Sequence, residues 1–186
     1  FKIIGYDNDK KITSKLSAGK TSINEPNLKE KLISNKEKLT FTSNLHELIN
    51  CDIVYISRDI PTNNYGKSNA ETIVALIKDV NLVIKKNILL IILCQVNPGF
   101  TRKINRDNKY LYYQVETLIF GRALERALFP ERIILGCADE THFIDKRLSL
   151  FLETFNCPIL PMIYESAELA KTAINIMLAS QVSVAN

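Results

Sequence analysis

The sequence predicts an α/β fold in which helices cover both faces of a parallel β-sheet. Short, continuously apolar runs recur along the chain, and segments with helical periodicity separate them. Strands that are apolar on both sides are typical of parallel sheets buried between helices. Such sheets bind ligands at the carboxyl ends of their strands.

The expected elements alternate in chain order. The apolar runs FKIIGYD and ILLIILC are the clearest strands, and the predicted strands cover 1–7, 39–43, 52–57, 88–94, 111–116, 132–137 and 157–160. Pro26 fits the first turn of a helix. The predicted helices cover 9–18, 25–36, 45–50, 68–85, 98–107, 121–128 and 140–155, and a last helix starts near Glu165 and runs toward the end.

Composition excludes several classes of function. The 186 residues are 46% hydrophobic and 24% charged, as in a soluble globular protein. The net charge is +4, and the lysines are scattered without interleaved aromatics, so no nucleic-acid partner is predicted. The longest apolar run is too short to cross a membrane, and no signal peptide is visible. The four cysteines form no CxxC pair, which favours free thiols and a cytoplasmic location.

Polar residues follow several predicted strands. They include Asp7, the segments 57–62 and 94–98, and Glu116 within 114–118. Asp7 can hydrogen-bond ribose hydroxyls in a dinucleotide fold, or it can cap a helix. Glu116 can act as a base, or it can be an ordinary loop glutamate. His46 and His142 show no partner arrangement, and no metal site is predicted.

The last helix carries Lys171 and Asn175 four residues apart, and so on one face. An ammonium and a carboxamide on one face can hold a substrate oxygen between them. They can equally be surface residues, with Glu168 pairing to Lys171 across one turn.

Seven motifs in register resemble the UDP-glucose/GDP-mannose dehydrogenase family, the nucleotide-sugar 6-dehydrogenases. The motifs are GYDND (5–9), GKTSINEPNL (19–28), DIVYISRDIPTNNYG (52–66), CQVNPGFTR (94–102), YQVETLIFGRAL (113–124), FPERIILG (129–136) and SAELAKTAIN (166–175). The resemblance implies a Rossmann-like NAD-binding domain over 1–162 and the start of a central helical dimerisation domain over 163–186. It also implies a first strand and glycine turn before Phe1 and a catalytic cysteine after Asn186, so the chain alone is expected to be inactive.

The resemblance also implies the chemistry and its residues. The family oxidises the primary alcohol of a nucleotide sugar such as UDP-glucose twice, to the uronic acid, with NAD, and supplies polysaccharide precursors. The catalytic residues by resemblance are Lys171 and Asn175, which stabilise charge on the sugar oxygen, and Glu116, which handles water. The substrate would lie beside Lys171 and the backbone of Thr117 and Leu118. The cofactor-binding residues by resemblance are Asp7, Pro61, Thr62 and Gln95. A homodimer is expected for the full-length protein.

Two alternatives stay open at this point. Another NAD enzyme of the β-hydroxyacid dehydrogenase type shares the K-x-x-x-N helix motif. A non-catalytic nucleotide-sugar binder of the same fold is favoured by Val115, Phe120 and Gln95, which stand where the family usually has proline, glutamate and threonine.

Overall fold

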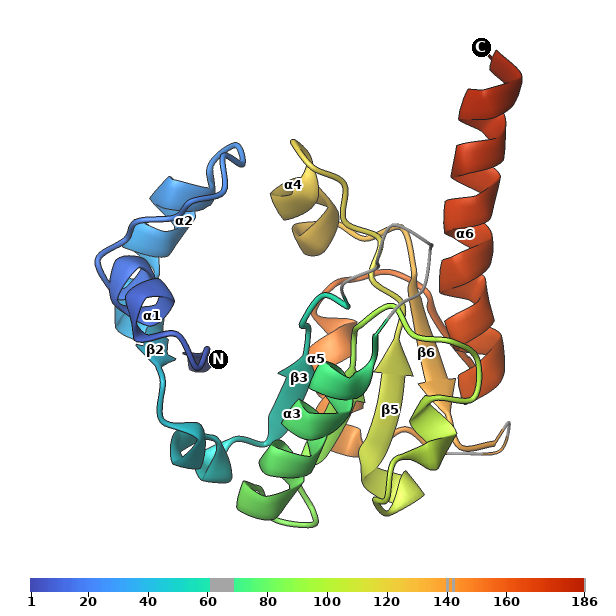
Figure 1. Cartoon of the computed structure of the whole chain (residues 1–186), viewed down its shortest axis with the longest axis horizontal. Helices are drawn as coiled ribbons and strands as arrows, with labels where there is room; N and C mark the ends of the chain where they lie inside the picture. Colours follow the sequence, from blue (N-terminus) through green and yellow to red (C-terminus); the bar gives the residue numbers. More distant parts are fainter. Residues whose placement is uncertain (61–68, 140, 142, 186) are drawn as a thin grey trace.

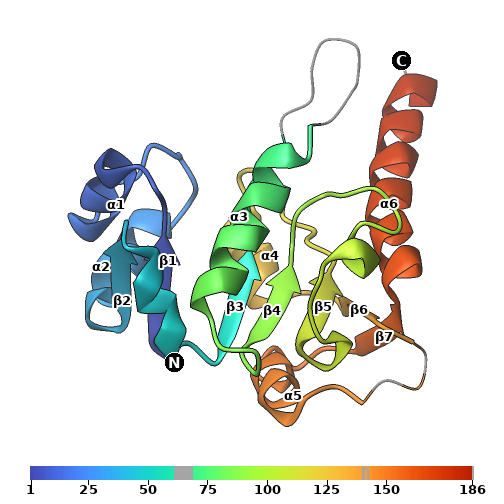
Figure 2. The same ribbon diagram turned by 60° about the horizontal axis from the view of Figure 1, so that its bottom comes forward.

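The computed structural model describes residues 1–60, 69–139, 141 and 143–185, and its elements form two groups (Figure 1). The smaller group contains a two-stranded sheet: β1 (Ile3–Tyr6), α1 (Lys10–Ser17), α2 (Leu28–Ser34), the 3-10 helix η1 (Lys36–Lys38) and β2 (Leu39–Thr42). The 3-10 helix η2 (Leu45–Asn50) connects it to the larger group (Figure 2).

The larger group is a five-stranded sheet with its helices. In chain order it contains β3 (Ile53–Ile56), α3 (Glu71–Val83), β4 (Leu89–Ile92), η3 (Thr101–Lys103), η4 (Asn108–Tyr110), β5 (Leu111–Gln114), α4 (Ala123–Leu128), β6 (Ile133–Cys137), α5 (Lys146–Glu153), β7 (Ile159–Ile163) and α6 (Tyr164–Ala185). The strand order is β3-β4-β5-β6-β7.

Helices cover both faces of the larger sheet, as predicted. Leu90 and Ile92 of β4 pack into one buried cluster with Ile73, Ile77 and Val80 of α3. The alternating residues Leu89 and Ile91 pack into a second cluster with Leu148 and Leu152 of α5. Figure 1 shows α3 in front of the sheet and α5 behind it. All of β4 is therefore apolar because both of its faces are covered.

The sheet is not entirely parallel, which corrects the sequence prediction. Four neighbouring pairs are parallel: β1 with β2, β3 with β4, β4 with β5, and β6 with β7. The pair β5 and β6 is antiparallel, with Tyr113 opposite Gly136. A parallel pair needs a connection that crosses back to the starting edge of the sheet. Helix α4 has six residues and lies at the edge where β5 ends, so β6 starts there and runs back (Figure 1).

The helix predicted for 98–107 is wrong. Only the short 3-10 helix η3 forms there, because Gly99 adopts a left-handed φ of 85°. The backbone N–H groups of Gly99 and Thr101 also donate to the side chain of Glu168 instead of to a helix. The segment 45–50 is a 3-10 helix, and the last strand lies slightly later than predicted, at Ile159–Ile163.

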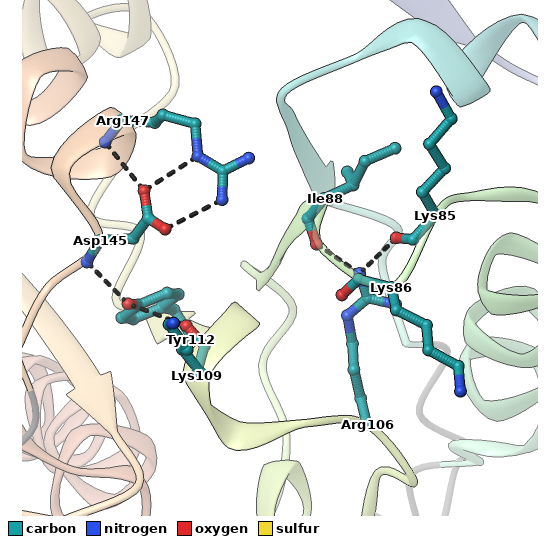
Figure 3. Close-up of polar contacts among 8 residues, drawn as sticks. All are labelled: Lys85, Lys86, Ile88, Arg106, Lys109, Tyr112, Asp145 and Arg147. Carbon is teal, nitrogen blue, oxygen red and sulfur yellow. Dashed lines mark hydrogen bonds and ion pairs between the residues drawn. The ribbon is translucent and has the colours of Figure 1, made fainter.

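Polar contacts hold the loops around the larger sheet in place (Figure 3). The guanidinium of Arg106 donates to Asn81 Oδ1 at 2.8 Å and to the backbone oxygens of Lys85 and Ile88. It thereby ties the loop before β5 to the end of α3. Asp145 caps α5 by accepting from Arg147 N–H at 2.9 Å, and its own N–H donates to the Tyr112 hydroxyl.

A cleft separates the two sheets. Its cavity of about 1640 Å³ is lined by residues 1–9 of the β1 segment and by residues 50–59 of the β3 segment. Within the described ranges β1 pairs only with β2, and β3 only with β4, so each strand has one unpaired edge. The chain thus forms two sheets where the sequence predicted one. Phe1 bridges the two groups through an edge contact with Phe151, 5.3 Å between ring centroids.

Candidate functional site

Helix α6 brings four sequence-predicted residues together at the carboxyl edge of the larger sheet. Gln95 follows β4, Glu116 follows β5, and Lys171 and Asn175 project from α6. The helix approaches the sheet closely because Gly136 of β6 has no side chain. A Cβ added there would lie 3.0 Å from the Cβ atoms of both Ala167 and Tyr113.

Lys171 contacts the end of β5. Its Nζ donates to the backbone oxygen of Glu116 and lies 3.5 Å from Glu116 Oε2. The two side chains are only 13% and 29% exposed, and Glu116 also accepts from the N–H of Leu118. The surface pair of Lys171 with Glu168, the simpler explanation of the helix spacing, is therefore not the arrangement found.

Asn175 lies one turn further along and contacts the segment after β4. Its Nδ2 donates to Gln95 Oε1 at 2.9 Å. Asn175 is partly buried and Gln95 is exposed. The same face of α6 therefore places an ammonium and a carboxamide beside the ends of two neighbouring strands. The four-residue spacing predicted the shared face but not these partners.

Glu168 is a site residue that the sequence prediction missed. Its side chain is fully buried and accepts from Gly99 N–H at 2.5 Å and from Thr101 N–H at 2.8 Å. It anchors the loop after Gln95 to α6. The signal was present in the sequence, because Tyr164, Ala167 and Glu168 follow the i, i+3, i+4 pattern of a buried helix face.

A buried tyrosine lies behind this anchor. The hydroxyl oxygens of Tyr113 and Thr101 have no hydrogen-bond partner within the described part of the chain. Burial raises the pKa of Tyr113, and the nearby carboxylates of Glu168 and Glu116 raise it further. Tyr113 therefore stays neutral and offers a hydroxyl, not a phenolate, beneath the site.

Asp7 lies at the carboxyl end of β1 and lines the cleft. It does not cap α1: that role falls to Asp9, which accepts from Lys11 N–H at 2.7 Å. Asp7 Oδ1 accepts from Asp9 N–H at 2.8 Å, which fixes the carboxylate at the strand end. The helix-cap interpretation of Asp7 is therefore wrong, and its ribose-binding role stays a prediction.

The remaining predicted residues are less constrained. Thr117 and Leu118 are exposed in the loop after Glu116. Pro61, Thr62 and His142 lie outside the described residues, and His46 is exposed. No cluster of three or more metal-ligating side chains occurs among the residues that the structure describes.

The four cysteines are free thiols. Cys94 and Cys137 are buried, and burial raises the pKa of each to about 11. The Sγ of Cys94 donates to the backbone oxygen of Ile56 at 3.2 Å. Both side chains are therefore protonated structural groups at neutral pH and not nucleophiles.

An α/β sheet with a carboxylate at the end of β1 and polar side chains at the carboxyl edge defines a Rossmann-like nucleotide-binding domain. The sequence model of the UDP-glucose/GDP-mannose dehydrogenase family, NAD binding domain, matches residues 1–155. The chain belongs to this family, as the motifs in the sequence indicated, and NAD is the cofactor of its domain.

Individual relatives agree. The chain is 28% identical to UDP-glucose 6-dehydrogenase of Rickettsia conorii, over 97% of this chain and 44% of the relative. It is 25% identical to a putative UDP-glucose 6-dehydrogenase of Bacillus subtilis, YtcA, over 99% of this chain and 45% of the relative. The chain therefore spans about half the length of the curated relatives that it matches.

Solved structures show the same fold. A UDP-glucose dehydrogenase from Pyrobaculum islandicum superimposes with a TM-score of 0.84 at 27% identity, over 100% of this chain and 46% of that one. A GDP-mannose dehydrogenase from Pseudomonas aeruginosa gives a TM-score of 0.87 at 20% identity, over the same shares of the two chains. Among the described helices, none combines the length and apolar character that a bilayer span requires.

Proposed function

We propose that the chain is the NAD-binding part of an enzyme that oxidises the primary alcohol of a nucleotide sugar, such as UDP-glucose, to the uronic acid. One observation carries the proposal: α6 holds the Lys171 ammonium and the Asn175 carboxamide beside the ends of β4 and β5. In this proposal, residues 1–162 of the chain form the cofactor domain, and residues 163–186 begin a central helical domain.

The residues present suit part of NAD. The Asp7 carboxylate, fixed by Asp9 N–H, suits the hydroxyls of the adenosine ribose. Gln95, at the end of β4, stands on the side of α6 where the nicotinamide is expected. When bound, NAD⁺ supplies the hydride acceptor for each oxidation.

Lys171 and Asn175 serve the substrate oxygen. The hydroxyl proton of the alcohol passes to water, and the carbon that bears the oxygen gives up a hydride. Because the proton leaves ahead of the hydride, negative charge develops on the oxygen in between. A fixed ammonium and a fixed amide N–H stabilise this charge without reorganising, which lowers the barrier. Lys171 is suited to this because contact with the Glu116 backbone oxygen holds its Nζ in place.

Glu116 serves the second half of the reaction. Its carboxylate lies 3.5 Å from Lys171 Nζ and is 29% exposed, so a water molecule can reach it. A carboxylate in that position can orient the water that would hydrolyse a thioester on the family's catalytic cysteine, which gives the acid and the free thiol. Thr117 and Leu118 follow it as exposed residues, and their backbone would lie beside the nucleotide sugar. None of the four cysteines is assigned as the thiol of this step.

A second function is favoured by two departures from the family's usual residues. Gln95, which accepts from Asn175, stands in place of threonine, and Phe120, which is 92% exposed, stands in place of glutamate. A nucleotide-sugar binder without activity would tolerate both changes.

The test uses the full-length gene product with UDP-glucose and NAD⁺. The proposal expects two molecules of NADH for each molecule of sugar oxidised. It also expects Lys171→Ala to lose most of the NADH formation. Binding of UDP-glucose without NADH formation would favour the non-catalytic function. Activity on a β-hydroxyacid and none on the nucleotide sugar would favour the wider dehydrogenase group.

A further inference from the structure

The segment between Glu116 and Gly121 has little packing of its own. Leu118 and Ile119 are each 47% exposed, and Phe120 is 92% exposed. Gly121 has a left-handed φ of 81°, and α4 begins two residues later without a side-chain cap of its own, because Arg122 makes no capping hydrogen bond. The segment is therefore held by whatever fixes its two ends.

Lys171 fixes the near end through the backbone oxygen of Glu116. Glu25 fixes the far end. Its Oε2 accepts from Gly121 N–H at 2.8 Å, and its Oε1 accepts from Ala123 N–H at 2.7 Å. Ala123 is the first residue of α4, and its N–H has no partner within the helix. The Glu25 carboxylate supplies the acceptor that this N–H lacks.

Glu25 comes from the other group of elements. It lies just before α2, 96 residues from Gly121 in the sequence. Figure 1 shows α2 and α4 opposite each other, each belonging to a different group of elements. Pro26, Asn27, Leu124 and Phe129 line a small cavity of about 290 Å³ around this contact.

We propose that Glu25 is a positioning residue for the nucleotide sugar, acting through the backbone of segment 116–121. It fixes the end of the segment opposite to Lys171 and so sets the path of Thr117 and Leu118. This inference rests on the proposed function, because that function places the nucleotide sugar against this segment.

The test measures dissociation constants of UDP-glucose and of NAD⁺ by calorimetry on the full-length gene product. Glu25→Ala should weaken UDP-glucose binding about tenfold, the loss expected for removing charge-assisted hydrogen bonds that order a binding loop. NAD⁺ binding should change less than about twofold, because Asp7 and its strand are untouched. Glu25→Gln keeps one acceptor oxygen and should lose less.

Glu30→Gln is the matched control, since Glu30 is an exposed acid on the neighbouring α2. It should bind both ligands like the wild type. Amide exchange at Gly121 and Ala123 gives a second measurement, which should become faster in Glu25→Gln even if Glu25→Ala does not fold.

Unchanged UDP-glucose binding in Glu25→Ala would overturn the inference. So would an equal loss of NAD⁺ binding, which would show that Glu25 only holds the two groups of elements together. Neither result depends on turnover. Wild-type protein that binds UDP-glucose and forms no NADH would count against the proposed function. The binding constants of the Glu25 variants would still test the role of Glu25 in that case.

Discussion

Replacing Glu168 by glutamine should release the loop after Gln95. Glu168 is fully buried and accepts from two backbone N–H groups, at 2.5 and 2.8 Å. Glutamine has one acceptor oxygen, so one buried N–H loses its partner. Leaving such a group unsatisfied costs about 2–3 kcal/mol. Local opening of the loop should therefore become on the order of 30- to 150-fold more frequent.

Limited proteolysis reports this opening, because Arg102 and Lys103 are trypsin sites in η3. Cleavage there should accelerate by the same factor, as followed by mass spectrometry. Glu165→Gln is the matched control. Glu165 pairs with Arg102 across side chains that are 33% and 44% exposed, so its loss costs at most about 1 kcal/mol. Equal cleavage rates in the two variants would refute the anchoring role of Glu168.

Three further predictions follow from cofactor choice, thiol burial and strand edges. The full-length protein should prefer NAD⁺ to NADP⁺, because the Asp7 carboxylate repels a 2′-phosphate, and comparable rates with both cofactors would contradict this. Burial raises the pKa of Cys94 and Cys137 from 9.0 to about 11, so the folded state holds these protons more tightly. Stability should therefore be unaffected below about pH 9 and fall as pH rises toward 11, and urea midpoints that stay constant over this window would contradict it. The 186-residue chain alone should self-associate, because β1 and β3 each leave one edge unpaired in the described structure, and a monomer with a sharp thermal transition in light scattering would argue against it.

The regular parts of the fold could be predicted from local pattern. The all-apolar β4 indicated a strand covered on both faces, and α3 and α5 pack there. The antiparallel pairing of β6 could not be predicted in this way, because it depends on where α4 lies and not on the residues of β6. The helix expected over 98–107 failed for a similar reason: Glu168, almost seventy residues later, takes the N–H groups of Gly99 and Thr101.

The candidate site shows the same division. The spacing of Lys171 and Asn175 placed them on one face, and the structure brings that face to Glu116 and Gln95. The role of Glu25 could not be predicted from spacing, because its partners are backbone N–H groups of a distant loop. The expected dimer and cytoplasmic location stay predictions. Exposed Ile176, Met177 and Val182 on α6 are consistent with a subunit contact.

The most direct test of the central claim is steady-state kinetics of Lys171→Ala in the full-length protein. If Lys171 stabilises charge on the sugar oxygen, turnover should fall on the order of 10²- to 10³-fold. UDP-glucose affinity should fall by no more than about tenfold, the loss expected for one anchor of segment 116–121. Lys171→Arg should not restore turnover, because a planar guanidinium cannot replace a point charge at a fixed site.

Asn175→Ala should act in the same direction, and the double variant should lose less than the product of the two effects, since both side chains serve one oxygen. Lys103→Ala, which removes an exposed lysine of η3, controls for the loss of a positive charge and should keep wild-type turnover. Near wild-type turnover in Lys171→Ala would contradict the account, and a large, specific fall in turnover with binding retained is the result that it predicts.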